Sequence, residues 1–360
     1  MKTVRFLNKE TKQFAPALRK NVNDYFKEKK ISTKGNARML WKALVMLSLY
    51  IVPFVLILTL PISTWLMFVF AVVMGIGMAG VGMSVMHDAA HGSFSNKSWL
   101  NKMFGWTMYG LGGNVFNWKL QHNVLHHTFT NIKGFDEDIG TKVAVRLSHD
   151  APLKKYHRFQ HLYAFFFYSL MTLAKLVSDF FQLASYNKAG YTKQQNAKPA
   201  REFLKMTVAK VLYLSVVIGL PMLVTSFAWW EVLLAFLFLH LTASLIMSLV
   251  FQMAHVVEGV DQPKANADGE IENEWAVHEL YTTCNFSKRN RLLGWYIGGL
   301  NFQIEHHLFP NISHIHYRKI AVIVENTARE FGLPYNQKRT FMHALASHVR
   351  TLRELGRPVQ

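Results

Sequence analysis

Long apolar runs dominate the hydrophobic pattern of this chain, and they come in two closely spaced pairs. A helix needs about 20 apolar residues, each adding roughly 1.5 Å, to cross the hydrocarbon core of a bilayer. Four runs reach or approach this length almost without charge, at Ala43–Leu60, Trp65–Met86, Val211–Trp230 and Val232–Val257. Their length, and the absence of charge from the first pair, disfavour four buried helices of a large soluble protein. The pattern predicts an all-α integral membrane protein with four transmembrane helices in two hairpins.

Two further apolar segments do not fit a span. Residues 99–118 are interrupted by glycines and by Lys102, so they are expected to dip into the membrane or to pack under a cytoplasmic domain. Residues 159–184 hold an uncharged run too short to cross, which predicts an amphipathic helix on the membrane surface. The polar stretch 187–202 is expected to connect to the third span, and an acidic loop after residue 257 to lead into a mostly helical tail.

Basic residues are confined to three parts of the chain, and they determine the expected topology. Of the 40 Lys and Arg, 11 precede residue 39, Lys42 stands at the mouth of the first span, 16 lie in 87–210 and 12 follow residue 256. The short turns between paired spans hold none, so both termini and the middle region are expected to face the cytoplasm. The expected organisation is a basic N-terminal segment (1–38), a membrane domain with a cytoplasmic helical cap (39–350) and a C-terminal tail (351–360).

The formal net charge of +18 is compatible with nucleic acid, anionic lipid or an acidic protein as a partner. Nucleic acid is disfavoured because the basic residues are spread over segments next to membrane spans. A solvated face against anionic headgroups accounts for most of this charge. The single cysteine, Cys284, excludes an intrachain disulfide and any thiolate cluster. An ion bound by this chain is therefore held by nitrogen and oxygen.

Seven of the 17 histidines gather in three short motifs next to the apolar runs. HDAAH contains His87 and His91, HNVLHH contains His122, His126 and His127, and QIEHH contains His306 and His307. Histidines four residues apart lie one turn apart on a helix, which suits two ligands of one metal ion. One such pair is more often a capped or solvent-facing helix end. Three clusters on the same expected side of the membrane favour a metal site.

The number and type of these residues indicate more than one metal ion. Neutral imidazole suits zinc, copper, iron and nickel. Seven clustered histidines exceed what one ion can use, so they predict two metals. Soluble di-iron bundles use mainly glutamate with a Glu-x-x-His pattern, and this chain shows no such repeated pattern.

The three motifs, in this order and flanked by two membrane hairpins, resemble the integral-membrane fatty acid desaturases. The resemblance runs from about Met86 to Lys319 and includes FDEDIG (135–140), EWAVHELYTTCNFS (274–287) and GGLNFQIEHHLFPNISHIHY (298–317). Glutamine in place of the first histidine of the third motif is similar to the front-end subgroup, which desaturates between an existing double bond and the carboxyl end. The resemblance implies a di-iron enzyme that uses O2 and two electrons to introduce a cis double bond. It also implies position Δ6 of an 18-carbon polyunsaturated acyl chain.

The resemblance implies the metal ligands as well. Seven histidines match the family's boxes, and an eighth, His255, stands where the family has a ligand near the end of the fourth span. The alternative for His255 is a core histidine bonded to a backbone carbonyl. The implied ligands are His87, His91, His122, His126, His127, His255, His306 and His307. Gln303 is expected to hold a metal-bound water or to accept a ligand N–H, since an amide is a poor direct ligand for iron.

Carboxylates beside the boxes are expected to orient ligand imidazoles, because a metal-bound histidine usually donates its other N–H. They are Asp88 and Glu305, next to ligands, and Asp136 and Asp138, which follow the second box; plain surface charge is the alternative. His278 lies in a stretch that resembles the family but outside its boxes, and His314 and His316 are expected beside the site or at the interface. The remaining histidines are interpreted as structural or solvated: His149, His157, His161, His240, His343 and His348.

An apolar substrate would suit a narrow tunnel that runs from the cytoplasmic side between the spans. Aromatic residues at helical spacing are usually core, but the expected lining is Met83, Phe94, Trp118, Phe129, Tyr296 and Phe302. Basic residues near the boxes are expected to bind the phosphates of an acyl-CoA or acyl-lipid, or to dock an acidic electron carrier: Lys119, Lys288, Arg289 and Arg291.

The expected electron donor is a separate protein. Many eukaryotic front-end members carry a fused cytochrome b5 domain, and this chain lacks the HPGG motif of that domain. A ferredoxin or a cytochrome b5 is therefore the expected donor. The same departure from the family pattern favours a bacterial plasma membrane as the location.

Other functions would use the same residues. The metal chemistry alone would also permit a hydroxylase or mono-oxygenase, whereas the box spacing and QIEHHLFP favour desaturation. A bis-histidine membrane cytochrome would place single ligands on facing spans, which does not explain paired histidines. A metal transporter is expected to hold its ligands at mid-membrane, and these motifs lie past the ends of the spans.

Overall fold

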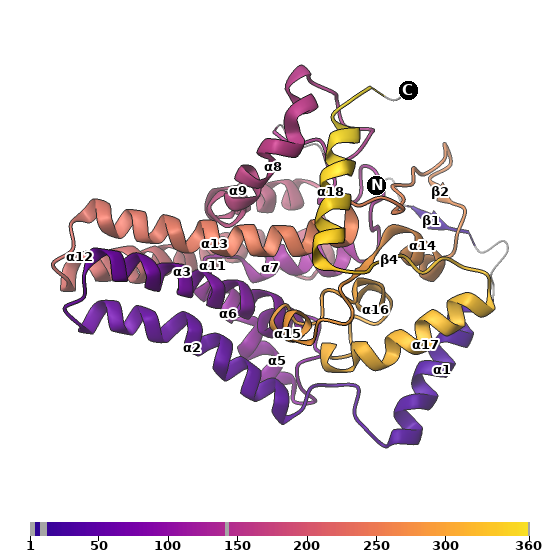
Figure 1. Cartoon of the computed structure of the whole chain (residues 1–360), viewed down its shortest axis with the longest axis horizontal. Coiled ribbons are helices and arrows are strands. Elements are labelled where there is room, and N and C mark those ends of the chain that lie inside the picture. The colour runs from indigo at the N-terminus through magenta and orange to yellow at the C-terminus, as the bar shows by residue number, and fades with distance from the viewer. Residues whose placement is uncertain (1–3, 8–12, 141–143, 359–360) are drawn as a thin grey trace.

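Four long apolar helices run in two hairpins and form one bundle (Figure 1). The computed structural model describes residues 4–7, 13–140 and 144–358; the other parts of the expected N-terminal segment and C-terminal tail lie outside the described residues. In the first hairpin, α2 (Ala37–Thr59) pairs with α3 (Thr64–Gly80), which continues through the π-helix η1 (Val81–Met86) into α4 (His87–Ala90). In the second, α11 (Pro199–Leu214), the π-helix η4 (Ser215–Gly219) and α12 (Leu220–Val224) precede α13 (Trp229–His255).

The third apolar helix starts earlier than its hydrophobic pattern predicts. The helices that are long and apolar enough to cross a membrane are Ala37–Thr59, Thr64–Ala90, Pro199–Val224 and Trp229–His255. The third was expected from residue 211, with 187–202 as a polar connector. Its early turns carry charge, but they bury Glu202, Met206 and Lys210 on one face. The Lys210 ammonium donates to Asp179 at 2.9 Å, so a charge that argues against a span is neutralised inside the bundle.

Residues 159–184 form two helices where a single amphipathic helix was expected. α8 (Gln160–Ser169) follows a short 3₁₀ turn, η3 (Lys155–Phe159), and meets α9 (Met171–Lys188) at an angle of 75°. Together they are apolar enough for a broken span. The charges of α9 are again paired, because the Asp179 carboxylate also lies 3.2 Å from the Lys175 nitrogen.

α3 lies between α2 and α13, and glycines allow it to approach both closely. A Cβ on Gly77 would lie 2.5 Å from the backbone of α2, and one on Gly75 would lie 2.6 Å from the backbone of α13. At the far end, the Thr64 hydroxyl donates to Glu231 at 2.8 Å. This bond ties the two hairpin turns together.

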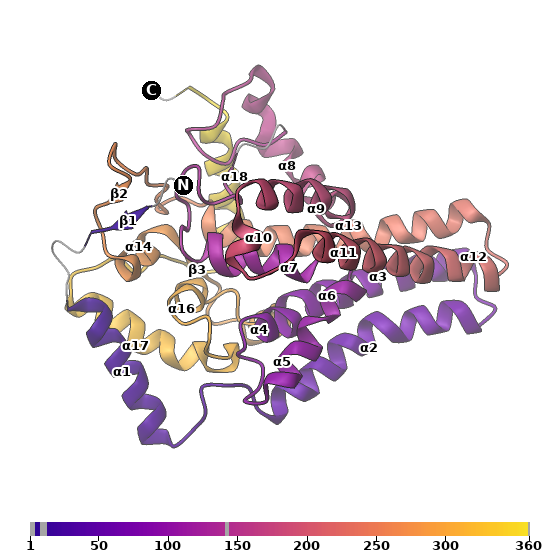
Figure 2. The ribbon, with the colours of Figure 1, turned by 180° about the vertical axis from the view of Figure 1, so that it is seen from behind.

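Shorter helices cover the opposite end of the bundle, where the histidine motifs lie (Figures 1 and 2). α1 (Phe14–Lys29) packs on α17 (Tyr317–Glu330), and α18 (Phe341–Leu355) packs on α13 and α8. The segment 99–118, expected to dip into the membrane or to pack under a cytoplasmic domain, is broken into α5 (Ser98–Gly105), α6 (Thr107–Gly110) and α7 (Val115–Trp118). The other helices are η2 (Lys119–His126), α10 (Tyr191–Gln194), α14 (Trp275–Thr282), α15 (Arg291–Tyr296), α16 (Gln303–Leu308) and η5 (His314–His316).

Strand structure is limited to two short parallel pairs in the part of the chain that the structure describes. β1 (Arg5–Phe6) pairs with β2 (Glu270–Ile271), and β3 (Asn285–Phe286) pairs with β4 (Gln337–Lys338). The first pair joins the N-terminal segment to the loop before α14. The second joins the C-terminal part of the chain to the region before the third histidine box. Both pairs therefore tie distant parts of the chain together around the histidine motifs.

Candidate metal centre

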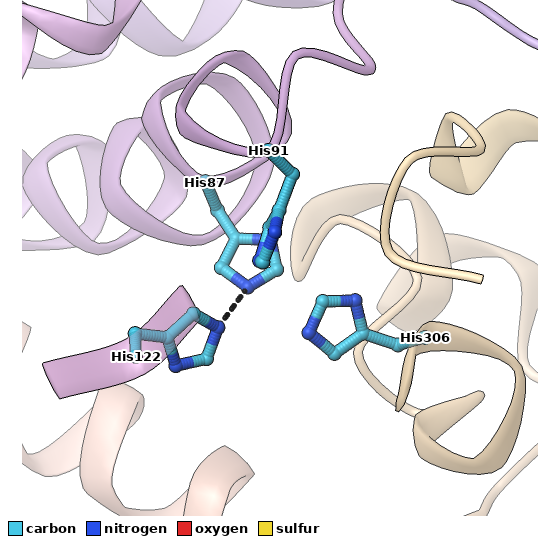
Figure 3. A group of neighbouring side chains, drawn as sticks. All are labelled: His87, His91, His122 and His306. Atoms are coloured by element: carbon cyan, nitrogen blue, oxygen red, sulfur yellow. Dashed lines mark hydrogen bonds between the residues drawn. The ribbon is translucent and has the colours of Figure 1, made fainter. Parts of the chain in front are cut away.

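Four histidines from three segments form a first group at the inner end of α3. His87 begins α4, His91 follows it, His122 comes from η2 and His306 from α16 (Figure 3). Their nearest ring nitrogens all lie within 4.8 Å of one another. The Nε2 atoms of His87 and His122 are 3.0 Å apart. Two nitrogens that bind one ion at right angles, each at about 2.1 Å, would be separated by about 3 Å.

A second group lies beside the first and is more deeply buried. It consists of His126, His255 and His307, whose ring nitrogens also lie within 4.8 Å of one another. His255 is the last residue of α13, so the fourth apolar helix contributes to the site. His127 lies between the groups, because its nitrogen is within the same distance of those of His306 and His307. The structure thus brings together all eight histidines expected as ligands.

The π-helix η2 divides the second box between the two groups. The spacing of His122 and His126 suggested two ligands of one ion, but His122 belongs to the first group and His126 to the second. In a π-helix the backbone bonds link residues five apart, and the amide of His127 donates to the carbonyl of His122 at 3.1 Å. The rings of these two residues are consequently close, with centroids 4.7 Å apart. The rings of His122 and His126 are stacked, with centroids 5.4 Å apart and planes at 20°, yet their nitrogens belong to different groups.

Polar partners hold the outer nitrogens of three clustered histidines. The Nδ1 of His126 lies 3.0 Å from Asp136, and that of His306 lies 3.1 Å from the Tyr317 hydroxyl. The Nδ1 of His307 lies 2.8 Å from Glu279 and 3.1 Å from the Thr130 hydroxyl. Such contacts fix the tautomer and ring orientation of a metal-binding histidine.

The ring nitrogens that face the inside of the groups include several without a hydrogen-bond partner. The Nε2 atoms of His91, His126 and His306 are buried without a hydrogen-bond partner in the described part of the chain. Buried polar atoms are nearly always paired, and an orphaned nitrogen beside others of its kind fits a metal ligand. The donor set is therefore suited to metal ions that prefer imidazole.

Burial controls the charge of most of these rings. It lowers the pKa values of the clustered histidines outside the apolar helices well below the usual range, which keeps the rings in the neutral form that binds metal; they are His91, His122, His127, His306 and His307. For His126 burial acts in the same direction, but Asp136, Asp138 and Glu279 overcome it and raise the pKa to about 9. Burial raises the pKa of Glu279 well above its usual range, whereas His126 helps to lower the pKa of Asp136, so the negative charge beside His126 lies on Asp136.

Gln303 lies within the second group. Its side-chain amide nitrogen is 2.8 Å from the Nε2 of His255 and 3.2 Å from that of His307. Because the nitrogen and oxygen of an amide are assigned from their surroundings, either atom can face these rings. Gln303 therefore occupies the space between two candidate ligands and is not an incidental neighbour of the box.

Of the four carboxylates expected to orient ligands, two contact a clustered histidine and two contact other residues. Asp136 contacts His126, and Asp138 lies 3.4 Å from the same ring nitrogen. Asp88 instead contacts His314 and accepts a hydrogen bond from Ser313 at 2.9 Å.

Glu305 also contacts residues other than a ligand. It accepts hydrogen bonds from Asn285 at 2.9 Å and from Tyr335 at 2.7 Å, and burial raises its pKa to about 7. It points away because neighbouring residues of a short helix face different directions, so adjacency to His306 does not bring Glu305 to the ring.

Two polar contacts of the site were missed in the sequence. Glu279, buried within α14, contacts His307, and Tyr317, at the start of α17, contacts His306. Both lie in stretches whose family resemblance was visible, but neither adjoins a box. A charged residue among apolar neighbours in WAVHELYT was the available signal for Glu279.

These features agree with the outcome of comparison with known proteins. The family model described as fatty acid desaturase matches residues 63–339, a range that contains all eight clustered histidines. The chain belongs to the fatty acid desaturase family. The expectation drawn from the three boxes is confirmed, and the protein is an enzyme that desaturates fatty acids.

The desaturase also has curated relatives that match most of its length. It is 32% identical over 346 residues to the sn-1 linoleoyl-lipid 6-desaturase of Arthrospira platensis, with 95% of this chain and 92% of the relative covered. The enzyme of the same name from Synechocystis sp. is 32% identical over 345 residues, with 96% of each chain covered. The acyl-lipid (8-3)-desaturase of Physcomitrium patens is 33% identical over 356 residues, with 98% of this chain and 74% of the relative covered.

The residues expected to line a tunnel in this desaturase are mostly core. Trp118 is the exception, because its ring stacks on that of His122 with centroids 4.5 Å apart. Phe94 packs against Phe104, Phe129 packs against Phe135, and the Tyr296 hydroxyl donates to the backbone of α3 at 2.8 Å. Met83 and Phe302 are buried in separate hydrophobic clusters.

The four basic residues expected to bind headgroups or a redox partner differ in availability. Lys119 is exposed, and its positive charge contributes, after burial, to the lowered pKa of His91. Lys288 is engaged with Glu325 at 3.0 Å. Arg289 and Arg291 are exposed beside the start of α15.

Most other histidines of the desaturase have structural contacts, as expected. His278 lies 2.8 Å from the carbonyl oxygen of Thr130, and His240 lies 2.8 Å from the hydroxyls of Tyr213 and Thr172. His348 donates to the carbonyl of Val256 at 2.7 Å. His314 lies beside the site, between Asp88 and Lys42.

Proposed function

We propose that this desaturase is a front-end enzyme that introduces a cis double bond at Δ6 of a linoleoyl chain carried by a membrane lipid. The position and the carrier are those named for the relatives from Arthrospira and Synechocystis. Glutamine at the start of the third box, Gln303, agrees with the front-end subgroup. The single observation that carries the proposal is the convergence of eight histidines from four segments on two adjoining groups of ring nitrogens.

Two iron ions fit these groups. In this proposal His87, His91, His122 and His306 hold one ion, His126, His255 and His307 hold the other, and His127 lies between them. Iron bound there would supply the activation of O2 and the cleavage of an unactivated C–H bond, which side chains cannot perform. The 3.0 Å separation of the His87 and His122 nitrogens suits two ligands of a single ion. The paired histidines of each box favour separate ions over a bis-histidine haem, which would use single ligands on facing helices.

The chain's own residues orient the ligands and exclude water. One ring nitrogen of His126 is held by Asp136, and one of His306 by Tyr317. One ring nitrogen of His307 is held by Glu279 and Thr130. In each ring the other nitrogen then points to the ion. The three histidines of the second group are at most 1% exposed, and Gln303 is 3% exposed, so water does not reach the second group freely. Gln303 has the reach to place a water or a ligand N–H between His255 and His307.

Electrons are proposed to arrive from a separate acidic carrier of the ferredoxin or cytochrome b5 type. The support is Lys119, an exposed cation on η2 whose neighbour Trp118 stacks on a ring of the first group. In the described part of the chain, Lys119 has no ion-pair partner that would neutralise it. A positive surface beside the exposed edge of the site would steer an acidic protein toward it.

The site and both termini are proposed to lie on the cytoplasmic side of a bacterial plasma membrane. The short turns of both hairpins carry no Lys or Arg, whereas the segments at the opposite end are strongly basic. Both turns lie at the end of the bundle away from the histidine motifs (Figure 2). The positive-inside rule then gives this orientation.

The proposal is tested in a host that makes no Δ6 fatty acid, fed with linoleate and analysed by gas chromatography with mass spectrometry. The expected product has a new double bond between the existing ones and the carboxyl end. His306→Ala and His307→Ala are each expected to abolish this product. Both are also expected to lower the iron content of the purified protein from about two per chain, because each residue supplies a ring nitrogen to one of the groups. His343→Ala, an exposed histidine outside the groups, is the matched control.

Three outcomes would contradict parts of this proposal. A double bond on the methyl side of the existing ones would exclude the front-end assignment. A hydroxylated product would favour the related mono-oxygenases. A haem absorption band in the purified protein would exclude the di-iron assignment.

A further inference from the structure

A groove of about 1000 Å³ runs along the outside of the transmembrane bundle, between α2, α6 and α11. It is separate from the metal centre, because none of the eight clustered histidines lines it. α11 and the η4 segment that continues it contribute a row of apolar side chains four residues apart, Leu204, Val208, Leu212 and Val216. This spacing places them above one another on a single helix face. The groove is thus a straight apolar channel parallel to α11.

The length of the groove corresponds to one leaflet of a bilayer. Its lining on α11 and η4 runs from Arg201 to Val217, which at about 1.5 Å per residue is about 24 Å. Half of a bilayer, including its headgroup layer, is about 20–22 Å thick. A molecule that fills the groove therefore extends from the membrane surface to its middle.

One end of the groove is cationic and aromatic. Arg201 and Lys205 lie in the first two turns of α11, before its uncharged part, beside Trp106 and Tyr109 of the α6 region. Tryptophan and tyrosine are enriched at the level of lipid headgroups, and Trp106 is 60% exposed. The Lys205 nitrogen lies 2.7 Å from Glu202, whereas Arg201 has no ion-pair partner in the described part of the chain. This end therefore retains a net positive charge.

The other end is apolar and locally irregular. Val216 and Val217 belong to the π-helix η4, and π-helical turns occur frequently at functional sites. The other two π-helices of this chain, in its described part, precede and carry histidine boxes. The hydroxyl of Tyr50 donates to Gly110 at 2.9 Å, and the hydroxyl of Tyr213 lies 2.8 Å from His240, so the polar tips of both tyrosines are engaged. Their rings are left to form apolar walls.

We propose that this groove is a binding site for an anionic phospholipid of the surrounding membrane. One acyl chain lies along the Leu204–Val216 row, and the headgroup phosphate contacts Arg201 and Lys205. The apolar walls bind the acyl chain, the leaflet-long span fits one lipid, and the cationic end selects the headgroup charge. The site is distinct from the metal centre and does not depend on which acyl chain the enzyme desaturates.

The test uses the full chain in detergent, delipidated and then mixed with phosphatidylglycerol or phosphatidylcholine, with bound lipid counted by native mass spectrometry. Phosphatidylglycerol is expected to bind several-fold better. Arg201→Ala and Lys205→Ala are each expected to lower its binding about fivefold, with little effect on phosphatidylcholine. The matched control is Lys188→Ala with Lys193→Ala, which removes two exposed cations outside the groove.

A second variant tests the apolar wall. Ala209→Phe fills the groove between Lys205 and Tyr213 and is expected to lower the binding of both lipids. Thermal melting and iron content report folding, and if this variant unfolds, the two cation variants decide the result. Equal binding of the two lipids by the wild type would overturn the proposal. So would an equal loss of binding in the Lys188/Lys193 control.

Discussion

The two histidine groups are made of the same side chains but are held in different ways. In the second group, His126 and His307 each have a carboxylate at their outer nitrogen, and both rings are at most 1% exposed. In the first group a phenol, Tyr317, is the partner of His306, while His91 and His122 are only half-buried. The difference indicates two unequal sites, a fully buried one whose ligands contact carboxyl groups and a more accessible one beside Trp118.

The largest effect is expected from removing a ligand of each group in turn. His255→Ala takes the α13 ligand from the second group, and His91→Ala takes a half-buried ligand from the first. Both should abolish the desaturated product, but the iron retained after dialysis should be lower for His255→Ala, because the fully buried group is expected to bind its ion more tightly. Equal iron loss in the two proteins would show that the groups are equivalent.

Replacing the polar partners of the histidines is expected to lower iron affinity as well, but less than removing a histidine does. Replacing a residue that orients a metal ligand typically costs about 10- to 100-fold in metal affinity or activity. Glu279→Gln replaces a carboxyl group that contacts both His307 and Thr130, whereas Tyr317→Phe removes a single neutral hydrogen bond to His306. Glu279→Gln should lower iron affinity more, measured by competition with a chelator. Glu305→Gln is the control, since this carboxylate contacts neither group.

Acid is expected to weaken the attachment of α13, which carries His255. The next residue, Val256, accepts a hydrogen bond from His348, whose pKa is lowered to about 4 by burial. The unfolded chain takes up a proton near pH 6.5, and the folded chain only near pH 4. The free energy of unfolding therefore falls as the pH drops from 6.5 to 4, by about 3 kcal/mol in total, so the folded protein becomes less stable. Thermal unfolding of His348→Gln should show a smaller loss over this range than the wild type, and an identical loss would contradict this role.

The smallest effect concerns the accessible side of the first group. Lys119→Glu should slow electron delivery by an acidic carrier roughly fivefold at low ionic strength, and the difference should shrink as salt is added. Turnover with a small chemical reductant should not change. Lys188→Glu is the control, and a similar slowing in that variant would remove Lys119 from the docking surface.

The sequence predicted the four helices and the eight clustered histidines because these depend on local pattern and on short motifs. It did not predict how the histidines divide, since His122 and His126 were separated by a π-helix that residue spacing does not reveal. Glu279 and Tyr317 reach their partners across 28 and 11 residues, so only the fold brings them together. The start of α11 was missed because Lys210 and Asp179 neutralise each other, and a charge count treats them as separate obstacles to a span.

Glu305 shows that a carboxylate next to a candidate ligand in sequence need not contact that ligand. Its neighbour His306 faces the first group, yet the carboxylate faces Asn285 and Tyr335 on the other side of the short helix. Similarly, Asp88 follows His87 directly but contacts His314, 226 residues away. Position beside a ligand in sequence therefore predicts burial for these acids, but it does not predict which ring they touch.

The short helix α16 has a mechanical consequence. His306 and His307 are consecutive, and their ring planes stand at 85° with centroids 5.4 Å apart, so one faces each group. A single peptide unit thereby acts as a spacer between the two groups. Stretching or tilting the long helices can move the whole pair, but bond lengths and angles limit any change in its internal separation. The reach of two adjacent side chains accordingly limits the distance between the two sites, and a membrane of varying thickness does not alter that reach.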